Sequence, residues 1–258
     1  MNKWIVLLCA ASVAVVGCFD NKGKPEDVPT AIGLDALLAT NRANIVRVIL
    51  RGETRSIPDE AFSGLAAIKM IDLSERGTKD VPAAAFGLKG IKEFYFARNG
   101  LETLPDLSCW AETLDYLNLD DNKLTAIPDH VGRLTRLKWL RLNGNKVADL
   151  PSGLASLTNL RRIYLKHNAL TAVPEVIKSW TALEDLSLDG NPITSVPDWV
   201  MTLPHLRAVS LCDTKITKLP ADLSPWKKLD LLALSACPLP REEMKRIRAA
   251  LPDVDVVF

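Results

Sequence analysis

The residues best suited to covalent or metal chemistry are few and scattered in this chain. His130, His167 and His205 lie in separate segments, so no two of them have the spacing of a metal-ligand motif. No P-loop, G-x-S-x-G or H-E-x-x-H string occurs. The strings around Asp121 and Asp189 carry the oxygen ligands that calcium prefers, but the same residue types also form tight bends. We therefore expect no catalytic residue, cofactor or metal.

Side chains suited to non-covalent recognition are better represented. Tyr95, Tyr116 and Tyr164 are the three tyrosines of the chain, and Trp139 and Arg141 lie between the last two. Tyr, Trp and Arg are the residue types that dominate binding hot spots, and an arginine can bond a carboxylate or stack on a ring. The alternative interpretation is that large side chains at these places merely shield a β-sheet. We take all five as candidate partner-binding residues.

A repeated string of residues positions these side chains. Eight Ile/Val/Leu-Pro steps recur, with the prolines spaced by 24 residues once and then by 23 six times, at 58, 82, 105, 128, 151, 174, 197 and 220. The clearest copies are LDYLNLDDNKLTAIP (114–128) and LKWLRLNGNKVADLP (137–151), which read L-x-x-L-x-L-x-x-N-x-L-x-x-L-P. This string resembles the leucine-rich repeat family. We number nine turns, and count positions from the first residue of each: Ile45, Ile68, Ile91, Leu114, Leu137, Leu160, Leu183, Leu206 and Leu229.

The resemblance implies an α/β solenoid, an arc in which a parallel β-sheet lines the concave face. Apolar residues alternate early in each turn, as in Leu117-x-Leu119, which is the period of a strand. The segments after the prolines lack a full helical apolar stripe, and two of them contain Pro204 and Pro225. They predict a convex side of mostly 3₁₀ or irregular structure. One such turn cannot cover its own leucines, so neighbouring turns must share a core.

An asparagine column is expected at position 9, where the chain bends after the strand. An amide both donates and accepts, so stacked amides can satisfy backbone groups that the bends would otherwise bury unpaired. Arg76, Thr214 and Cys237 replace asparagine near the ends of the array. The structural column comprises Asn99, Asn122, Asn145, Asn168 and Asn191.

Both ends of the array carry the signs of a cap. Residues 31–44 begin like a short amphipathic helix that runs into a strand, and residues 240–258 begin with Pro240, followed by a helical pattern and a strand-like end. A cap is needed because a solenoid otherwise exposes an apolar end. We expect a leucine-rich repeat domain over 31–258, with an N-terminal cap at 31–44, nine repeats over 45–239 and a C-terminal cap at 240–258.

Side chains at positions 2, 3, 5, 7 and 8 should point out of the concave sheet, and the five recognition candidates occupy positions 3 and 5. Trp110, Trp180 and Trp226 fall near position 21, where the repeat calls for an apolar residue, and we expect them in the core.

Charges at the outward positions are expected to neutralise one another between neighbouring turns. Turn 6 has bases where turn 7 has acids, and Lys138 likewise lies beside Asp115. Strands lie about 4.8 Å apart, so these charges predict lateral ion pairs that contribute a few tenths of a kcal/mol each. Among the bases of turns 5 and 6, Arg141 alone lacks a matching acid, because the same position holds Asn118 in turn 4 and Tyr164 in turn 6. The three pairs between turns 6 and 7 are Arg161 with Glu184, Arg162 with Asp185, and Lys166 with Asp189.

The first residues predict export and lipid attachment. Lys3 precedes thirteen apolar or small residues, Trp4–Val16, which are too few to span a bilayer, where about twenty are needed. Val15-Val16-Gly17-Cys18 resembles the bacterial lipobox, which implies a signal peptide at 1–17 and acylation of Cys18. The alternatives are a secretory peptide cut after Gly17 or an uncleaved anchor. Residues 18–30 are polar, with glycine and proline, and predict a flexible tether.

Charge and cysteine content restrict the partners further. Loss of residues 1–17 would remove Lys3 alone and leave equal numbers of basic and acidic residues, so a generic nucleic-acid binder is excluded. Cys109, Cys212 and Cys237 would remain beside Cys18. Cys212 and Cys237 lie on neighbouring turns but at positions 7 and 9, and we expect them to lie beyond disulfide reach.

The sequence therefore predicts a membrane-anchored interaction module, not an enzyme, in the bacterial cell envelope. Its partner would be a protein bound on the concave face. The alternative function is a structural envelope spacer or a self-associating scaffold without a specific ligand. In some Gram-negative lipoproteins an Asp directly after the acylated cysteine favours the inner membrane; Phe19 stands there, which favours the outer membrane.

Overall fold

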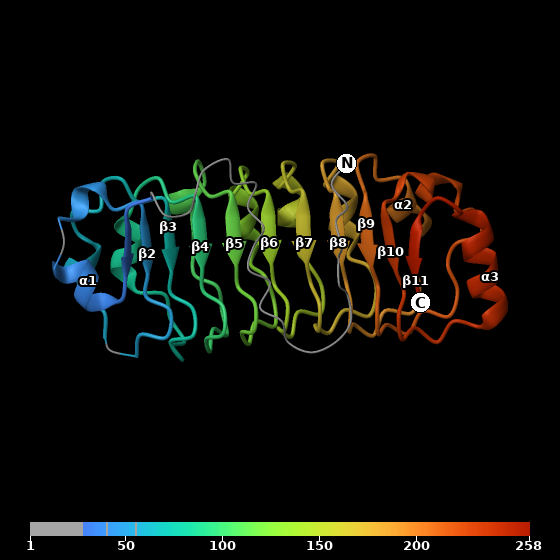
Figure 1. Cartoon of the computed structure of the whole chain (residues 1–258), viewed down its shortest axis with the longest axis horizontal. Helices are drawn as coiled ribbons and strands as arrows, with labels where there is room; N and C mark the ends of the chain where they lie inside the picture. The colour runs from blue at the N-terminus through green and yellow to red at the C-terminus, as the bar shows by residue number, and fades with distance from the viewer. Residues whose placement is uncertain (1–27, 40, 55) are drawn as a thin grey trace.

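One parallel sheet extends along the length of the molecule, with its strands side by side across the long axis (Figure 1). The computed structural model describes residues 28–39, 41–54 and 56–258, so the expected signal peptide, Cys18 and most of the expected tether lie outside the described residues. Within them, eleven strands pair in chain order. They are β1 (Thr30–Ile32), β2 (Arg47–Ile49), β3 (Met70–Asp72), β4 (Glu93–Tyr95), β5 (Tyr116–Asn118), β6 (Trp139–Arg141), β7 (Arg162–Tyr164), β8 (Asp185–Ser187), β9 (Ala208–Ser210), β10 (Leu231–Ala233) and β11 (Asp255–Val257).

The register of the strands follows the repeat. Tyr116 pairs with Trp139, and Trp139 pairs with Arg162, so residues 23 apart lie side by side. The middle residue of each strand from β1 to β10, such as Leu117 or Leu140, is buried in the core. Because side chains alternate along a strand, the first and third residues leave the sheet on the opposite side, which we call the sheet face.

The opposite side, which we call the turn side, consists mostly of short 3₁₀ turns. A proline directly precedes most of them because its fixed φ suits the start of a turn and its missing N–H costs no bond there. This confirms the predicted fold, with α2 (Asp198–Met201) as a short helical exception. The 3₁₀ turns are η2 (Arg42–Asn44), η3 (Asp59–Phe62), η4 (Ala83–Gly87), η5 (Ser108–Trp110), η6 (Asp129–Arg133), η7 (Ser152–Ser156), η8 (Glu175–Ser179) and η9 (Ser224–Lys228).

One elongated hydrophobic core lies between the sheet and the turn side. The leucines of the repeated string fill it, and Trp110, Trp180 and Trp226 are fully buried there, as predicted. The indole Nε1 of Trp110 donates to the Leu88 carbonyl at 3.0 Å, and that of Trp180 to the Leu154 carbonyl at 2.9 Å. Each of these rings therefore bonds the backbone of the preceding turn and ties two turns together.

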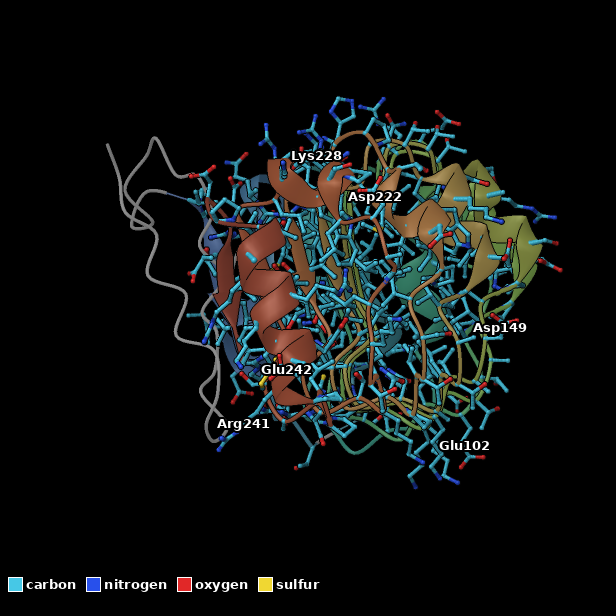
Figure 2. All side chains as sticks on the ribbon, turned by 90° about the vertical axis from the view of Figure 1, so that its right-hand side faces the viewer. Glu102, Asp149, Asp222, Lys228, Arg241 and Glu242 are labelled. Carbon is cyan, nitrogen blue, oxygen red and sulfur yellow. The ribbon has the colours of Figure 1, made fainter. Side chains whose placement is uncertain are left out.

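Short helices cover both ends of the core. α1 (Leu34–Ala39) buries Leu34 and Leu37 at the N-terminal end. α3 (Arg241–Ala250) follows Pro240 and buries Ile247; viewed along the solenoid, it crosses the C-terminal end, with the 3₁₀ turns on the side away from the strands (Figure 2). One difference from the sequence analysis lies at the front, where β1 precedes α1. Thr30, which we assigned to the tether, is therefore already part of the sheet.

Every turn bends after its strand through one residue in the left-handed region. Position 8 of all nine turns has φ between 50° and 69°, including the non-glycine residues Arg98, Asp121 and His167. Such φ values are uncommon outside glycine, although Asp, Asn and His are enriched there. The constant bend at position 8 places the asparagines of position 9 in one line.

Two neighbouring 3₁₀ turns approach so closely that only glycine fits between them. A Cβ added to Gly132 in η6 would lie 2.0 Å from the carbonyl oxygen of Gly153 in η7. By contrast, a Cβ on Gly87, at the end of η4, would meet no atom within 4 Å apart from its chain neighbours and the backbone of its own turn.

We expect Gly132→Ala to destabilise the fold by about 1 to 3 kcal/mol, because backbone must move to relieve the overlap. The matched change Gly87→Ala should be neutral or stabilising by up to about 1 kcal/mol, since it only restricts the unfolded chain. Urea unfolding of both variants measures the difference. Equal midpoints for the two would show that the η6–η7 contact can open without cost.

Candidate functional site

The five asparagines of position 9 lie in one hydrogen-bonded column. Each Nδ2 donates to the position 6 carbonyl of the preceding turn, at 2.8–3.0 Å. Four of the Oδ1 atoms accept the position 11 N–H of the preceding turn, at 3.0–3.1 Å. Asn99 instead accepts the N–H of Arg76, at 2.9 Å, where the second turn departs from the repeat.

Thr214 and Cys237 extend the column toward the C-terminal end. The hydroxyl of Thr214 donates to the Leu211 carbonyl at 2.9 Å, and the thiol of Cys237 donates to the same oxygen at 3.0 Å. Cys109, Cys212 and Cys237 are all free thiols. The two substituted residues therefore bond the bend as asparagines do elsewhere.

A second polar ladder runs along position 7, and the sequence analysis missed it. The side-chain oxygen at this position accepts the backbone N–H of the residue 23 further on. Asp120 accepts from the N–H of Asn143, and Asn143 accepts from the N–H of Lys166, both at 2.8 Å. Ser74 and Asp189 bond Ala97 and Cys212 in the same way, at 3.1 and 3.0 Å. The signal in the sequence was the recurrence of Ser, Asp or Asn two residues before position 9. These four bonds hold the strand ends in register between turns 2 and 3, turns 4 and 5, turns 5 and 6, and turns 7 and 8.

The lateral ion pairs form as predicted between turns 6 and 7. The distances are 2.9 Å for Arg161–Glu184, 2.9 Å for Arg162–Asp185 and 2.8 Å for Lys166–Asp189. Lys138 likewise lies 3.2 Å from Asp115. Most charge on the sheet face is therefore met by an opposite charge on the next strand.

The expectation that Arg141 lacks a matching acid is wrong. Its Nε and Nη2 atoms lie 2.7 and 2.6 Å from Oδ2 of Asp120. Asp120 is at position 7 of the preceding turn, whereas we compared only position 5. An arginine is long enough to reach this diagonal neighbour on the adjacent strand.

The aromatic candidates and two arginines lie together on the sheet face; we call Tyr95, Tyr116, Trp139, Tyr164, Arg141 and Arg162 the aromatic patch. The rings of Tyr95 and Tyr116 have centroids 4.9 Å apart, and those of Tyr116 and Trp139 5.5 Å. The Arg162 guanidinium continues the row, 4.4 Å from the Trp139 ring centroid.

Arg141 links Tyr164 to this patch. Its guanidinium lies 5.4 Å from the Tyr164 ring centroid while it pairs with Asp120. We expected Arg162 to serve only as the counter-ion of Asp185, but its contact with Trp139 places it within the patch. All six residues are partly exposed, so a partner could reach them.

Poor hydration changes the ionisation of groups within and beside the patch. Burial raises the pKa of Tyr116 to about 12. Burial also raises the pKa values of Asp120 and Asp185, although the positive charges of Arg141 and Arg162 oppose these two shifts. It raises the pKa of Glu93 as well, whose carboxylate accepts a hydrogen bond from the Tyr95 hydroxyl at 3.1 Å. Bonds that a partner makes with such partly buried groups are stronger than bonds on an open surface.

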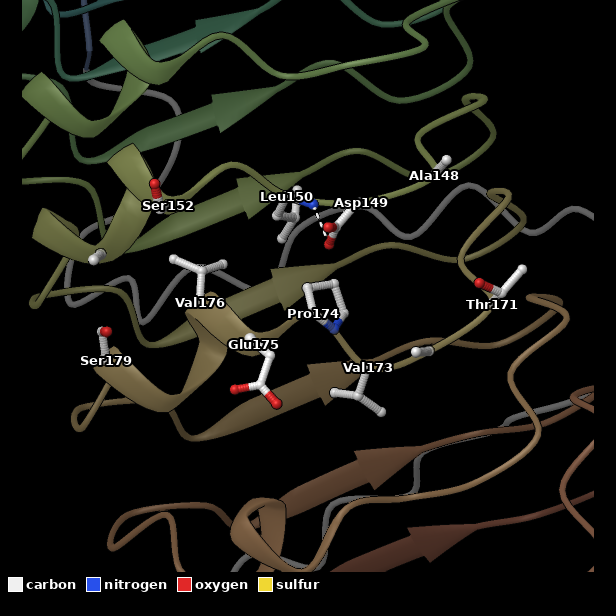
Figure 3. A pocket seen from close by; sticks show the side chains of 12 residues that line it. Ala148, Asp149, Leu150, Ser152, Thr171, Val173, Pro174, Glu175, Val176 and Ser179 are labelled. Atoms are coloured by element: carbon white, nitrogen blue, oxygen red, sulfur yellow. Dashed lines mark hydrogen bonds between the residues drawn. The ribbon is translucent and has the colours of Figure 1, made fainter.

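A separate groove lies on the turn side, between η7 and η8 (Figure 3). Its volume is ≈ 710 Å³, and it is lined largely by small and aliphatic side chains such as Ala155, Val173 and Val176. Glu175 at its rim pairs with Lys178, and Asp149 accepts its neighbour's N–H at 2.8 Å. None of the aromatic patch lines this groove.

The described residues contain no group of three or more His, Cys, Asp or Glu placed to hold a metal ion. Nor does any helix among the described residues have the length and apolar character needed to cross a membrane.

Residues 109–200 match the model of a leucine-rich repeat region. The chain also resembles the crystal structure of an internalin from Listeria monocytogenes, with a TM-score of 0.68, 21% identity and coverage of 88% of this chain and 70% of that one. The ectodomain of a membrane receptor kinase from Arabidopsis thaliana, solved in complex with CASPARIAN STRIP INTEGRITY FACTOR 2, matches with a TM-score of 0.60, 24% identity and coverage of 81% and 26%. No curated protein matches the sequence.

Likeness at these identities establishes the fold. Residues 109–200 are similar to leucine-rich repeats, and the chain has the solenoid fold of the two solved structures.

Proposed function

We propose that this chain is a lipid-anchored leucine-rich repeat module of the bacterial cell envelope that binds another protein through its sheet face. The observation that carries the proposal is the aromatic patch. Three aromatic rings and the Arg162 guanidinium contact one another in series across β4 to β7, and all remain partly exposed. Residues of these types, clustered and poorly hydrated, make up the centre of protein interfaces.

The alternative is a structural spacer that needs the solenoid but no ligand. A spacer would tolerate changes on the sheet face and depend on the number of turns. The mutual contacts of the aromatic side chains are compatible with shielding of the sheet, so the two functions must be separated by experiment.

Affinity capture of envelope material separates them. Residues 19–258 serve as bait beside a Trp139→Ala bait and a Trp199→Ala bait, and bound proteins are identified by mass spectrometry. Trp199 lies on the turn side, in α2, with the Lys178 ammonium 5.2 Å from its ring centroid. We expect one protein to bind the natural and Trp199→Ala baits and to be lost with Trp139→Ala. A protein held equally by all three baits argues against the sheet face.

Lipid anchoring rests on the sequence around Cys18. We expect Cys18→Ser to abolish incorporation of a labelled fatty acid, because the thiol is the acylated nucleophile in lipobox proteins. The variant should accumulate as precursor or leave the membrane fraction. Labelling that persists in Cys18→Ser, or stable membrane retention without label, would disprove this anchor.

A further inference from the structure

Charge on the sheet face is segregated by turn. At the outward positions of turns 5 and 6 every charged side chain is basic, and at those of turns 4 and 7 every one is acidic. We call the five bases the basic seam: Lys138, Arg141, Arg161, Arg162 and Lys166.

Each base of the basic seam forms its ion pair with an acid of turn 4 or turn 7, on the side away from the boundary between turns 5 and 6. Arg141 of turn 5 bonds Asp120 of turn 4, at 2.6 Å. Arg162 and Lys166 of turn 6 form ion pairs with Asp185 and Asp189 of turn 7, at 2.9 and 2.8 Å. The two basic turns therefore meet along the β6–β7 boundary with no outward carboxylate between them.

The two arginines also lie across this boundary in opposite directions. Arg141, on β6, contacts the ring of Tyr164 on β7, and Arg162, on β7, contacts the ring of Trp139 on β6. A guanidinium has five N–H donors, and the Asp120 carboxylate engages only two of those of Arg141. N–H donors of Arg141 therefore remain for an acceptor of the partner. The rings of Tyr164 and Trp139 beneath the two guanidinium groups limit their hydration.

The spacing of the bases matches an extended peptide. Arg162, Arg141 and Lys166 occupy positions 3, 5 and 7, each two residues from the next along parallel strands in register. Two residues of an extended strand advance about 6.6 Å. Alternate side chains of an extended segment laid along β6 and β7 would meet these three bases in turn.

We propose that the basic seam binds an extended segment of the partner protein that carries carboxylates at alternate positions. The proposal rests on the proposed function and names the chemistry of the partner. Acidic turns 4 and 7 flank the basic seam, so a partner surface that complements it carries negative charge along one line only. A polyanion with charge spread over a broad backbone meets repulsion from both flanks.

Selection from a displayed library of random twelve-residue peptides tests this before the partner is identified. The full-length chain, purified in detergent, is the target. We expect selected peptides to be enriched in Asp or Glu at alternate positions. Their affinity should fall at least about tenfold for the double variant Arg141→Gln/Arg162→Gln, as truncation of close charge pairs does at interfaces.

The matched control is Arg133→Gln, which removes a base from an exposed ion pair on the turn side, 3.3 Å from Asp106. It should leave peptide affinity unchanged. Thermal melts of all variants show whether the solenoid still folds, and Arg141→Lys/Arg162→Lys, which keeps the charge, should recover part of the affinity.

Three outcomes overturn the proposal. Selected peptides could be uncharged or basic, acidic peptides could bind the Gln variant as tightly, or polyphosphate could displace them at lower concentration than polyglutamate of equal charge. If Trp139→Ala weakens the selected peptides but the Gln variant does not, the sheet face still binds protein and only the acidic segment is wrong. If neither change matters, the proposed function fails as well.

Discussion

Asn145→Leu should lower the free energy of unfolding by about 2 to 6 kcal/mol. Asn145 lies in the middle of the column, where its Oδ1 accepts the Leu124 N–H at 3.0 Å and its Nδ2 donates to the Leu119 carbonyl at 2.9 Å. Loss of these two hydrogen bonds does not have the same effect on the two backbone groups. The Leu119 carbonyl still accepts Nδ2 of Asn122, at 3.0 Å, whereas the buried Leu124 N–H is left without an acceptor.

The expected loss of stability is the sum of two costs, one from the orphaned N–H and one from overpacking. An unsatisfied buried group costs about 1 to 3 kcal/mol, and forcing a branched apolar side chain into the bend adds a further cost of about 1 to 3 kcal/mol. Urea unfolding followed by circular dichroism measures the change.

Asn159→Leu is the matched control, because it makes the same substitution at position 23, where Nδ2 donates only to the Thr135 carbonyl on the surface. It should cost less than about 1 kcal/mol. Similar unfolding midpoints for the two variants would show that the column does not hold the turns together.

Trp139→Ala should weaken binding of the captured partner by about 1 to 4 kcal/mol, the range for truncation of hot-spot residues. The indole contacts both Tyr116 and Arg162, so its loss also removes the support that orients its neighbours. Titration calorimetry with the captured protein gives the affinity, and thermal melts of the same variant separate binding from folding.

Trp199→Ala is the corresponding change on the turn side, where the indole packs against the core. It should reduce stability and leave affinity unchanged. The site assignment is wrong if Trp199→Ala weakens the partner while Trp139→Ala binds like the natural chain.

The sequence predicted the solenoid because each turn repeats the same physical requirement. Apolar alternation predicted the strands, the prolines predicted the start of most 3₁₀ turns, and position 9 carries the asparagines that the bend needs. β1 was missed because Thr30–Ile32 falls before the repeated string: Thr30 was assigned to the tether, and Ala31 and Ile32 to the start of a cap helix. Strand pairing, and not local pattern, makes it part of the sheet.

The candidate site was only partly predictable. Comparing equal positions of neighbouring turns found the pairs of Arg162 with Asp185 and Lys166 with Asp189, since these side chains lie directly opposite one another. The same comparison failed for Arg141, because its length lets it choose a diagonal partner. The stacking of Arg162 on Trp139 was missed because a side chain can satisfy a carboxylate and a ring at once.

The order of the turns limits how this gene could change its length by recombination. Repeats of equal size invite deletion or duplication of one unit, and the backbone of this solenoid would accept such an event. Loss of residues 183–205, however, would place Arg207 and Ala208 where Glu184 and Asp185 now stand, and three bases of turn 6 would lose their acids. The central turns are therefore not interchangeable units, and viable changes in repeat number should concentrate toward the ends of the array.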